Sequence, residues 1–245
     1  MTRYHIGTSG WHYADWRDRF YPEKLSKSRW LDFYSRHFPT VEVNNSFYRL
    51  PSEAAFTGWY GASPEEFTFA VKVSRFITHI KRLKECDEPV NNFMSRATLL
   101  KEKLGPLLYQ LPPSLHRDDD RLAAFLSILP KGLKHVIEFR HASWLDEGVF
   151  AILREYDAGL CVFDMPEITC PLLSTSGFAY IRFHGSDSLY AGCYTDEELA
   201  EYASKIKEMA GTLDEVYIYF NNDIQGFALR NAETIRGYLE EGTEK

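Results

Sequence analysis

Residues 135–140 read HVIEFR, and the last four of them alternate between apolar and charged side chains. Successive side chains of a β-strand point to opposite faces, so Glu138 and Arg140 would share one face. The opposite face would carry the large apolar residues Ile137 and Phe139. Burying charged groups costs free energy unless they find partners, so the polar face has to meet something specific. The segment therefore predicts a strand that packs on helices with one face and contributes to a site with the other.

Seven other short apolar runs also have polar residues at or near their C-terminal ends. With the first segment, the runs cover residues 4–7, 40–43, 67–73, 107–111, 135–139, 160–163, 179–183 and 216–220. Amphipathic helical patterns lie between most of them, at residues 28–38, 52–60, 91–104, 118–129, 147–156, 195–210 and 227–239. Strands that alternate with helices are typical of a parallel sheet. Eight of them predict a single α/β domain over residues 1–245, a (β/α)8 TIM-type barrel.

One connection departs from this alternation. Residues 165–177, between the sixth and seventh runs, contain Pro166 and Pro171, and we expect the helix there to be short or missing. The alternative fold is a doubly wound open sheet, which usually carries a glycine-rich phosphate-binding fingerprint after a strand. The sequence GTSG at residues 7–10 is too sparse for that fingerprint, so the barrel is favoured.

The composition is that of an ordinary globular protein with an acidic excess. The chain has 245 residues, of which 44% are hydrophobic, and a formal net charge of −7. This charge argues against a general nucleic-acid binder, because such binding depends on Lys and Arg that neutralise phosphates. The four cysteines show neither CxxC spacing nor the density of a disulfide scaffold, which indicates a reduced, cytoplasmic setting. No apolar stretch approaches membrane-spanning length, so we expect no membrane association.

In such a barrel the active groups lie at the C-terminal ends of the strands and in the loops that follow them. The polar residues expected to face the interior there are Glu42, Asn44, Lys72, Gln110, Glu138, Arg140, Asp164, Arg182, His184 and Asn221. Their formal charges nearly cancel, which also fits an ion-pair network that only neutralises itself. We expect Glu42, Lys72 and Arg182 to form the deeper part of this set.

The outer part, expected nearer to solvent and accessible to a ligand, consists of Asn44, Arg140, His184 and Asn221. His184 is the best acid–base candidate, because an imidazole has its pKa near neutrality. Glu138 or Asp164 would orient its ring, while the two asparagines would fix polar groups of a substrate. The alternative for His184 is a structural histidine that is hydrogen-bonded to one of those carboxylates.

The segment after the third run is basic, whereas the chain as a whole is acidic. Between residues 72 and 84 it has no acidic residue, and its basic residues are Lys72, Arg75, Lys81, Arg82 and Lys84. Guanidinium groups suit phosphate and carboxylate, so Arg75 and Arg82, together with Arg140 and Arg182, are expected to hold an anionic substrate. The alternative is a basic loop that is merely solvated.

Two later loops and several aromatic residues belong to the same end of the barrel. Residues 184–187 and 221–223 follow the last two runs, where barrels often bind phosphate through backbone N–H groups. Asn222 suits that use, although the residues of both loops are equally common in turns. The aromatic residues of segment 11–16, with Phe47, Tyr48 and Trp144, could stack on a base or sugar ring. We favour the alternative, in which they cover the end of the barrel.

Neither a metal ion nor a cofactor is expected. A metal site needs histidine and carboxylate ligands that converge with little competition from cations. Here the interior carboxylates already face lysine and arginine, and no HxH or HExxH spacing occurs.

The chain resembles a known family, the YecE-like proteins or domain of unknown function 72. The matching stretches are GTSGWHYADWRDRFYP, VEVNNSFYRLP, FAVKVSRFITHIKRL, EFRHASW, YIRFHG, YAGCY and FNNDIQGFALRNA, which follow in order along nearly the whole sequence. The family pattern usually has Asn-Thr or Asn-Ser where this chain has Asn44-Asn45-Ser46, a minor departure. The resemblance implies a TIM-type barrel and no settled activity.

The sequence thus predicts a metal-independent enzyme, with hydrolase and lyase as candidate classes. Its partner would be an anionic, phosphate-bearing small molecule or nucleotide at the C-terminal mouth of the barrel. A nucleic-acid-binding or processing protein is the alternative, which the acidic net charge disfavours. A further alternative is a non-catalytic ligand-binding protein whose polar interior only stabilises the fold. The oligomeric state is not indicated.

Overall fold

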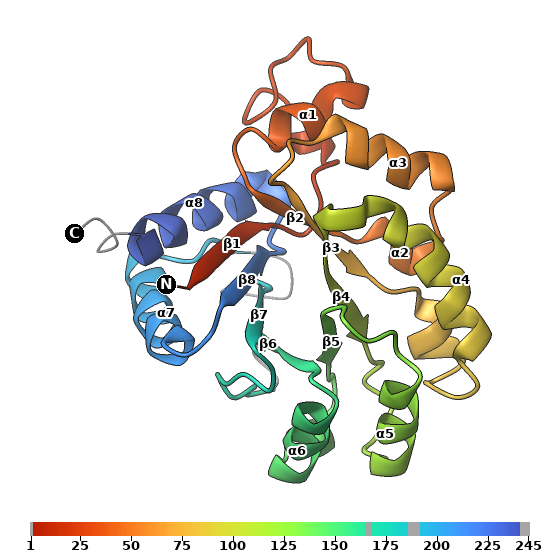
Figure 1. Ribbon diagram of the computed structural model, residues 1–245. Coiled ribbons are helices and arrows are strands. Elements are labelled where there is room, and N and C mark those ends of the chain that lie inside the picture. The colour runs from red at the N-terminus through yellow and green to blue at the C-terminus, as the bar shows by residue number, and fades with distance from the viewer. Residues whose placement is uncertain (1, 165–167, 186–191, 241–245) are drawn as a thin grey trace.

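The computed structural model of the chain describes residues 2–164, 168–185 and 192–240. In these residues eight parallel strands pair in chain order, and β8 pairs with β1, so the sheet closes into a barrel (Figure 1). The strands are β1 (Arg3–Thr8), β2 (Thr40–Val43), β3 (Thr68–Lys72), β4 (Leu104–Gln110), β5 (His135–Glu138), β6 (Gly159–Asp164), β7 (Phe178–Phe183) and β8 (Glu215–Phe220). The predicted barrel is confirmed, and the open doubly wound sheet is wrong.

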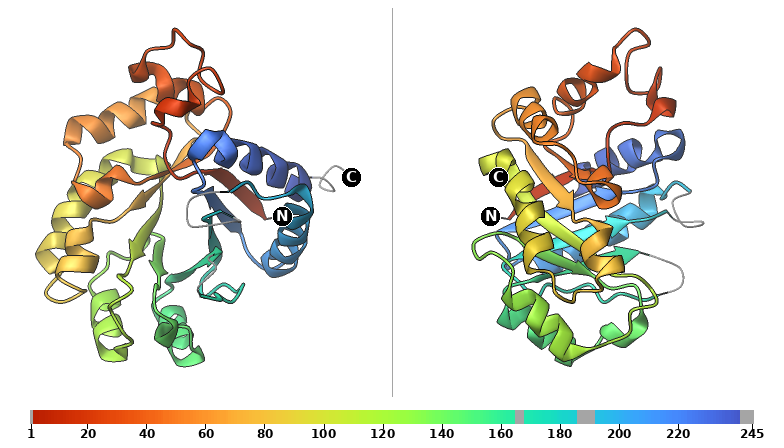
Figure 2. Two further views of the ribbon diagram at one scale, coloured as in Figure 1. Left: turned by 180° about the vertical axis from the view of Figure 1, so that it is seen from behind. Right: turned by 90° about the vertical axis from the view of Figure 1, so that its right-hand side faces the viewer.

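Helices lie around the outside of the strands (Figures 1 and 2). They are α1 (Trp30–Tyr34), α2 (Asn45–Tyr48), α3 (Glu53–Ala62), α4 (Asp87–Ala97), α5 (Asp119–Ser127), α6 (Glu147–Glu155), α7 (Asp196–Ala210) and α8 (Phe227–Glu240). Helix α4 begins at Asp87 instead of residue 91, because Pro89 falls in the first turn, where its missing N–H is not needed. None of the helices described is long and apolar enough to span a lipid bilayer.

The connection between β6 and β7 has no helix in its described residues, 168–177. Side chains take over part of the hydrogen bonding there. Thr175 Oγ1 donates to the carbonyl of Ala158 at 2.6 Å and accepts from the N–H of Leu160 at 2.8 Å. Ser174 Oγ donates to the carbonyl of Phe178 at 2.6 Å. The short connection is therefore fastened to the strands on both sides of it.

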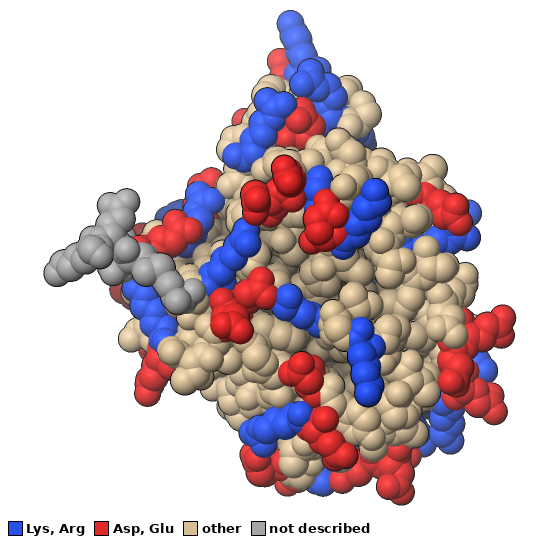
Figure 3. Space-filling model, in the orientation of Figure 1, with Lys and Arg blue, Asp and Glu red and all other residues tan. Residues whose placement is uncertain are grey.

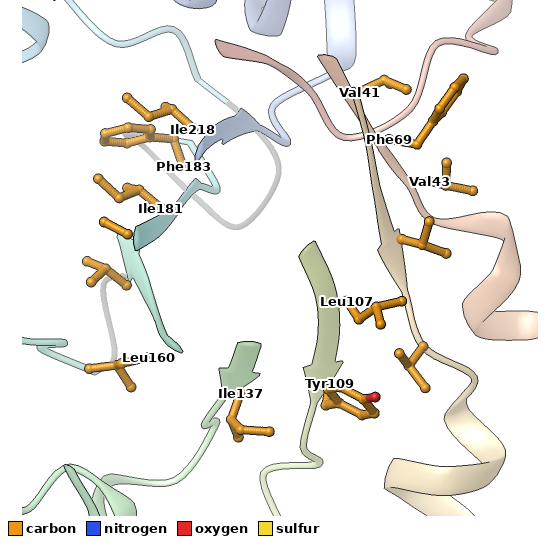
Figure 4. Packing of buried hydrophobic residues seen from close by; sticks show 14 of the residues in the cluster. Val41, Val43, Phe69, Leu107, Tyr109, Ile137, Leu160, Ile181, Phe183 and Ile218 are labelled. Carbon is orange, nitrogen blue, oxygen red and sulfur yellow. The ribbon is translucent and has the colours of Figure 1, made fainter. Parts of the chain in front are cut away.

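The outer faces of the strands form the main apolar core. Side chains such as Val41, Phe69, Ile137 and Ile181 are buried and lie outside the ring of strands in Figure 4. A second, smaller cluster fills the inside of the barrel and contains Ala70, Leu108, Val136, Cys161, Phe178, Tyr180, Tyr217 and Tyr219. Because side chains alternate, the residues two positions further along these strands also face inward. The polar residues at these positions of the strand ends therefore face the interior of the barrel, next to this inner cluster and on its C-terminal side.

The closure of the barrel between β1 and β2 requires a glycine. A Cβ atom on Gly7 would lie 2.2 Å from the carbonyl oxygen of Thr40 and 3.0 Å from the Tyr34 hydroxyl. That hydroxyl accepts a hydrogen bond from the N–H of Thr8 at 3.0 Å and donates to the Thr40 carbonyl at 3.1 Å. Tyr34 of α1 thus joins the two strands where few ladder bonds connect them.

Candidate functional site

A buried ion-pair network links three strand ends inside the barrel. The guanidinium of Arg182, on β7, donates to Glu42 Oε1 at 2.9 Å and to Glu138 Oε2 at 2.8 Å. Glu42 also accepts from Ser9 Oγ at 2.5 Å and from the Tyr180 hydroxyl at 2.6 Å. The charged side chains are at most 1% exposed. One arginine therefore joins β2 and β5 to β7 in the interior of the barrel.

A second arginine extends the network toward the mouth. The Nε and Nη2 atoms of Arg140 contact Glu138 Oε1, and its Nη2 lies 2.6 Å from Nε2 of His184. Its guanidinium also lies over the ring of Phe163, 5.3 Å from the ring centroid. Burial opposes the ionisation of Glu138, but Arg140 and Arg182 outweigh it and hold the pKa of this carboxyl well below its usual value. Glu138 is therefore ionised and flanked by two cations.

The structure corrects the expected position of His184 and Arg140, because neither lies near solvent. His184 is fully buried and Arg140 is 7% exposed. Burial, followed by the charge of Arg182, lowers the pKa of His184 well below its usual value. The neutral ring accepts a hydrogen bond from Arg140 at Nε2. This geometry does not suit the acid–base role predicted for His184.

Lys72 behaves differently from the rest of the deeper group. Its side chain is half-buried, and its ammonium lies 4.4 Å from the centroid of the Phe47 ring. It makes no hydrogen bond and no ion pair within 4.0 Å with the described residues. Burial, together with the charge of Arg182, lowers the pKa of Lys72 to about 8. The expected neutralisation of Lys72 by direct pairing is thus wrong, whereas Glu42 and Arg182 do pair.

Uncharged polar side chains at other strand ends make no hydrogen bond to the residues that the structure describes. Asn44, after β2, has a buried Oδ1 that accepts no hydrogen bond from them. Gln110, on β4, and Asn221, after β8, make no side-chain hydrogen bond to them either. Buried polar groups in proteins are normally satisfied, so the Oδ1 of Asn44 is available to a donor outside the described residues. Asn44 is expected near solvent and is half-buried, in agreement with that expectation. Asn221 is also expected near solvent but is buried, with 9% of its surface exposed.

Asp164 faces the opposite way from the prediction. Cys161 belongs to the inner cluster of the barrel, so Phe163 faces inward and Asp164 outward. Its Oδ2 accepts a hydrogen bond from the Tyr194 hydroxyl at 2.8 Å. This carboxylate therefore cannot orient His184. Without it, the interior group of Glu42, Glu138, Lys72, Arg140 and Arg182 has three cations and two carboxylates, one positive charge in excess among the described residues.

The predicted anion-binding loops are partly engaged by the protein itself. Arg75 is exposed, whereas Arg82 Nη2 donates to the carbonyl of Ser114 at 2.6 Å and to its hydroxyl at 2.9 Å. Asn222 is buried, and its Nδ2 donates to the carbonyl of Gly192 and to Asn231 Oδ1, both at 2.9 Å. Arg82 and Asn222 thus fasten loops. Ser186 and Asp187 of the loop after β7 lie outside the described residues.

Most of the aromatic residues at this end form the predicted cover. Trp11, Trp16 and Trp144 are at most 4% exposed, and Phe47 is 7% exposed. Trp16 Nε1 donates to the carbonyl of Asp223 at 2.9 Å, and Trp144 Nε1 to that of Leu115 at 2.7 Å. Only Tyr48 of the aromatic residues named from the sequence is strongly exposed, at 74%.

Sequence reasoning missed Asp223, which follows β8. Its Oδ1 is buried without a hydrogen-bond partner, while the residue as a whole is half-buried. Burial raises the pKa of Asp223 to about 8, and the charge of Glu42 acts in the same direction. At pH 7 this carboxyl is mostly protonated and can donate a proton. The sequence signal, an aspartate in a loop after the last strand, is too common in turns to have identified it.

The described residues contain no group of three or more His, Cys, Asp and Glu side chains that could hold a metal ion. The chemical groups on offer are an amine, a neutral carboxylic acid and several amides. They lie at the C-terminal strand ends, the place where barrels of this type carry their sites.

A closed ring of eight parallel strands with ionisable side chains at these ends defines the class of TIM-type (β/α)8 barrel proteins. Within it, the chain belongs to the family described as "Protein of unknown function DUF72", whose model matches residues 5–245. The resemblance seen in the sequence is thereby confirmed.

Relatives agree with this assignment. The chain is 26% identical to the UPF0759 protein YunF of Bacillus subtilis (strain 168), over 96% of this chain and 94% of that protein. It is 32% identical to the UPF0759 protein YecE of Escherichia coli (strain K12), over 48% and 44% respectively. The crystal structure of a DUF72 family protein of Thermotoga maritima MSB8 matches with a TM-score of 0.89 and 30% identity, covering 98% of this chain and all of that one.

Proposed function

We propose that the protein is a metal-independent enzyme that binds an anionic, phosphate-bearing small molecule at the C-terminal mouth of the barrel. The observation that carries this proposal is Lys72, a half-buried ammonium that makes no ion pair within 4.0 Å with the residues that the structure describes. An anion would supply the missing partner, and a cation with little competing solvent attracts it strongly.

Two asparagines and one aspartate could take part in a reaction of the bound ligand. The amides of Asn44 and Asn221 can bind hydroxyl or carbonyl groups of the ligand, because their side chains make no hydrogen bond to the residues that the structure describes. Asp223, protonated at neutral pH, is a suitable general acid. Asp223 replaces His184 in that role in this proposal.

A nucleic acid fits the arrangement less well. The basic residues of this group, Lys72, Arg140 and Arg182, belong to strand ends of the barrel and not to an extended surface. On the face shown in Figure 3, basic and acidic side chains are interspersed. Backbone phosphates of a nucleic acid need an extended region of one sign.

The proposal is tested with glycerol 3-phosphate, which carries a phosphate on a small polar body. We expect it to raise the melting temperature in a saturable way, because a ligand that binds only the folded state stabilises it. Glycerol is the uncharged control. Lys72→Met should weaken binding about tenfold or more, measured by calorimetry, since it removes the unpaired charge. The control variant Lys84→Met, at an exposed position of the basic loop, should bind like the parent protein.

Failure of glycerol 3-phosphate to bind, or equal binding by the Lys72→Met and Lys84→Met variants, would contradict the proposal. In that case the interior charges would serve the stability of the barrel alone.

A further inference from the structure

Among the lysines that the structure describes, burial lowers the pKa of Lys72 and Lys103. Lys103 is 5% exposed, but its Nζ donates to the carbonyls of Tyr60 and Ser63, each at 2.7 Å, so its hydrogen-bonding capacity is used. Lys72 is half-buried, its Nζ lies 4.4 Å from the centroid of the Phe47 ring, and it makes no hydrogen bond to a described residue. A lysine whose amine is partly desolvated and not held by hydrogen bonds is suited to act as a nucleophile.

The backbone of Lys72 is fixed while its amine is not. Its carbonyl accepts a hydrogen bond from Ser46 Oγ at 2.6 Å, and the following N–H, that of Val73, donates to the Leu108 carbonyl at 2.8 Å. The strand end is thus held by α2 on one side and by β4 on the other. The side chain therefore starts from a fixed backbone position, and its amine lies against the Phe47 ring of α2.

We propose that Lys72 forms a Schiff base with the carbonyl carbon of the substrate, so that the substrate is an aldehyde or ketone that carries an anionic group. This inference rests on the proposed anion-binding function and adds the reacting group and the second chemical feature of the ligand.

In this step the lone pair of the neutral amine attacks the carbonyl carbon, and one proton passes from the nitrogen to the carbonyl oxygen to give a neutral carbinolamine. The carbinolamine takes up one proton from solvent on its hydroxyl and loses it as water, and the nitrogen lone pair forms the C=N bond. One amine, one carbonyl compound and one proton therefore give one iminium ion and one water. No oxidant, reductant or metal enters the balance.

The surroundings suit both the free amine and the iminium ion. With the pKa of Lys72 lowered to about 8, roughly a tenth of the amines are neutral at pH 7, far more than for a lysine in water. The iminium ion keeps the positive charge that protonated Lys72 carries. Glu42 and Glu138, whose charges favour the cationic form of Lys72, stabilise it.

The test traps the Schiff base by reduction. The protein is incubated at pH 8 with glyceraldehyde 3-phosphate and sodium cyanoborohydride, and in parallel with glyceraldehyde, and the modified lysines are mapped by mass spectrometry. We expect Lys72 to be modified at least tenfold faster than the exposed Lys84 and the hydrogen-bonded Lys103. We also expect the phosphorylated aldehyde to modify Lys72 several-fold faster than the uncharged one.

The outcomes separate this inference from the proposed function. Modification of Lys72 no faster than that of Lys84 would overturn the Schiff base, even if glycerol 3-phosphate binds. Rapid modification of Lys72 by both aldehydes at the same rate would support the Schiff base and contradict the anionic group. Lys72→Arg provides the control for the site of reaction, because it keeps the charge but has no primary amine. In this variant the fast-reacting site should disappear, while the slow modification of Lys84 and Lys103 continues.

Discussion

At the scale of single residues, burial decides which ionisable groups can exchange protons. His184, the obvious candidate in the sequence, is made neutral by burial and by the charge of Arg182. Asp223 experiences the opposite effect, because burial and the charge of Glu42 favour its protonated form. The same physical cause thus removes one acid–base group from the site and creates another.

The raised pKa of Asp223 predicts a dependence of stability on pH. Its pKa is about 8 in the folded protein and about 4 in the unfolded chain, so the folded state binds the proton more tightly. The stabilisation from this group is complete below about pH 4 and is lost as the pH rises to about 8. The Asp223→Asn variant has no carboxyl at this position, so it does not lose this stabilisation as the pH rises. Relative to the parent protein, its free energy of unfolding should increase by about 1–3 kcal/mol between pH 4 and pH 9.

Urea denaturation at several pH values measures this difference. Glu23→Gln, at an exposed position, is the control and should differ from the parent protein by the same amount at every pH. A difference for Asp223→Asn that does not change with pH would show that the carboxyl is not held in its protonated form.

At the scale of elements, the polar interior joins strands that are far apart in the chain. Arg182 on β7 binds carboxylates of β2 and β5, and Tyr180 of the same strand donates to Glu42. The outer faces of these strands belong to the main apolar core, and Figure 4 shows Val41, Ile137 and Ile181 on the outside of the ring of strands. The strands are therefore fixed on both faces, by apolar packing outside and by charge pairing inside.

Arg182→Met should lower the free energy of unfolding by about 3–5 kcal/mol, because it leaves two buried carboxylates without their shared cation. Urea denaturation of the purified variant measures the effect. Arg154→Met removes an ion pair with Glu147 on the surface of α6, where both side chains are well exposed. This matched control should cost less than about 1 kcal/mol. Similar costs for both variants would mean that the interior network adds no more than a surface pair.

At the scale of the whole molecule, the fold depends on closure of the sheet. All six residues of strand β8 pair with β1 on one side and with β7 on the other. Helix α8 lies beside α7 and covers β1 and β8 from outside (Figures 1 and 2). The first and last parts of the chain are thus parts of one sheet, and neither edge can be left open without exposing unpaired backbone groups.

A chain that ends at Leu213 and lacks β8 and α8 should therefore fail to fold. We expect it to be aggregated or to lack a cooperative unfolding transition, as measured by size-exclusion chromatography and circular dichroism. A control chain that ends at Glu240 retains every described strand and helix and should unfold cooperatively. A folded, monomeric chain of residues 1–213 would contradict the dependence on closure.

The sequence by itself determined the number and order of the strands, the absence of a helix from residues 168–177, and the presence of ionisable residues at the strand ends. These properties follow from local alternation, which depends only on nearest neighbours along the chain. The tertiary structure decided the rest. Asp164 faces outward because Cys161 sets the parity of its strand, and the state of the other charges depends on partners such as Glu42 and Arg182, 140 residues apart. That Lys72 makes no ion pair within 4.0 Å with the residues that the structure describes is therefore a property of the closed barrel, which the local sequence pattern does not contain.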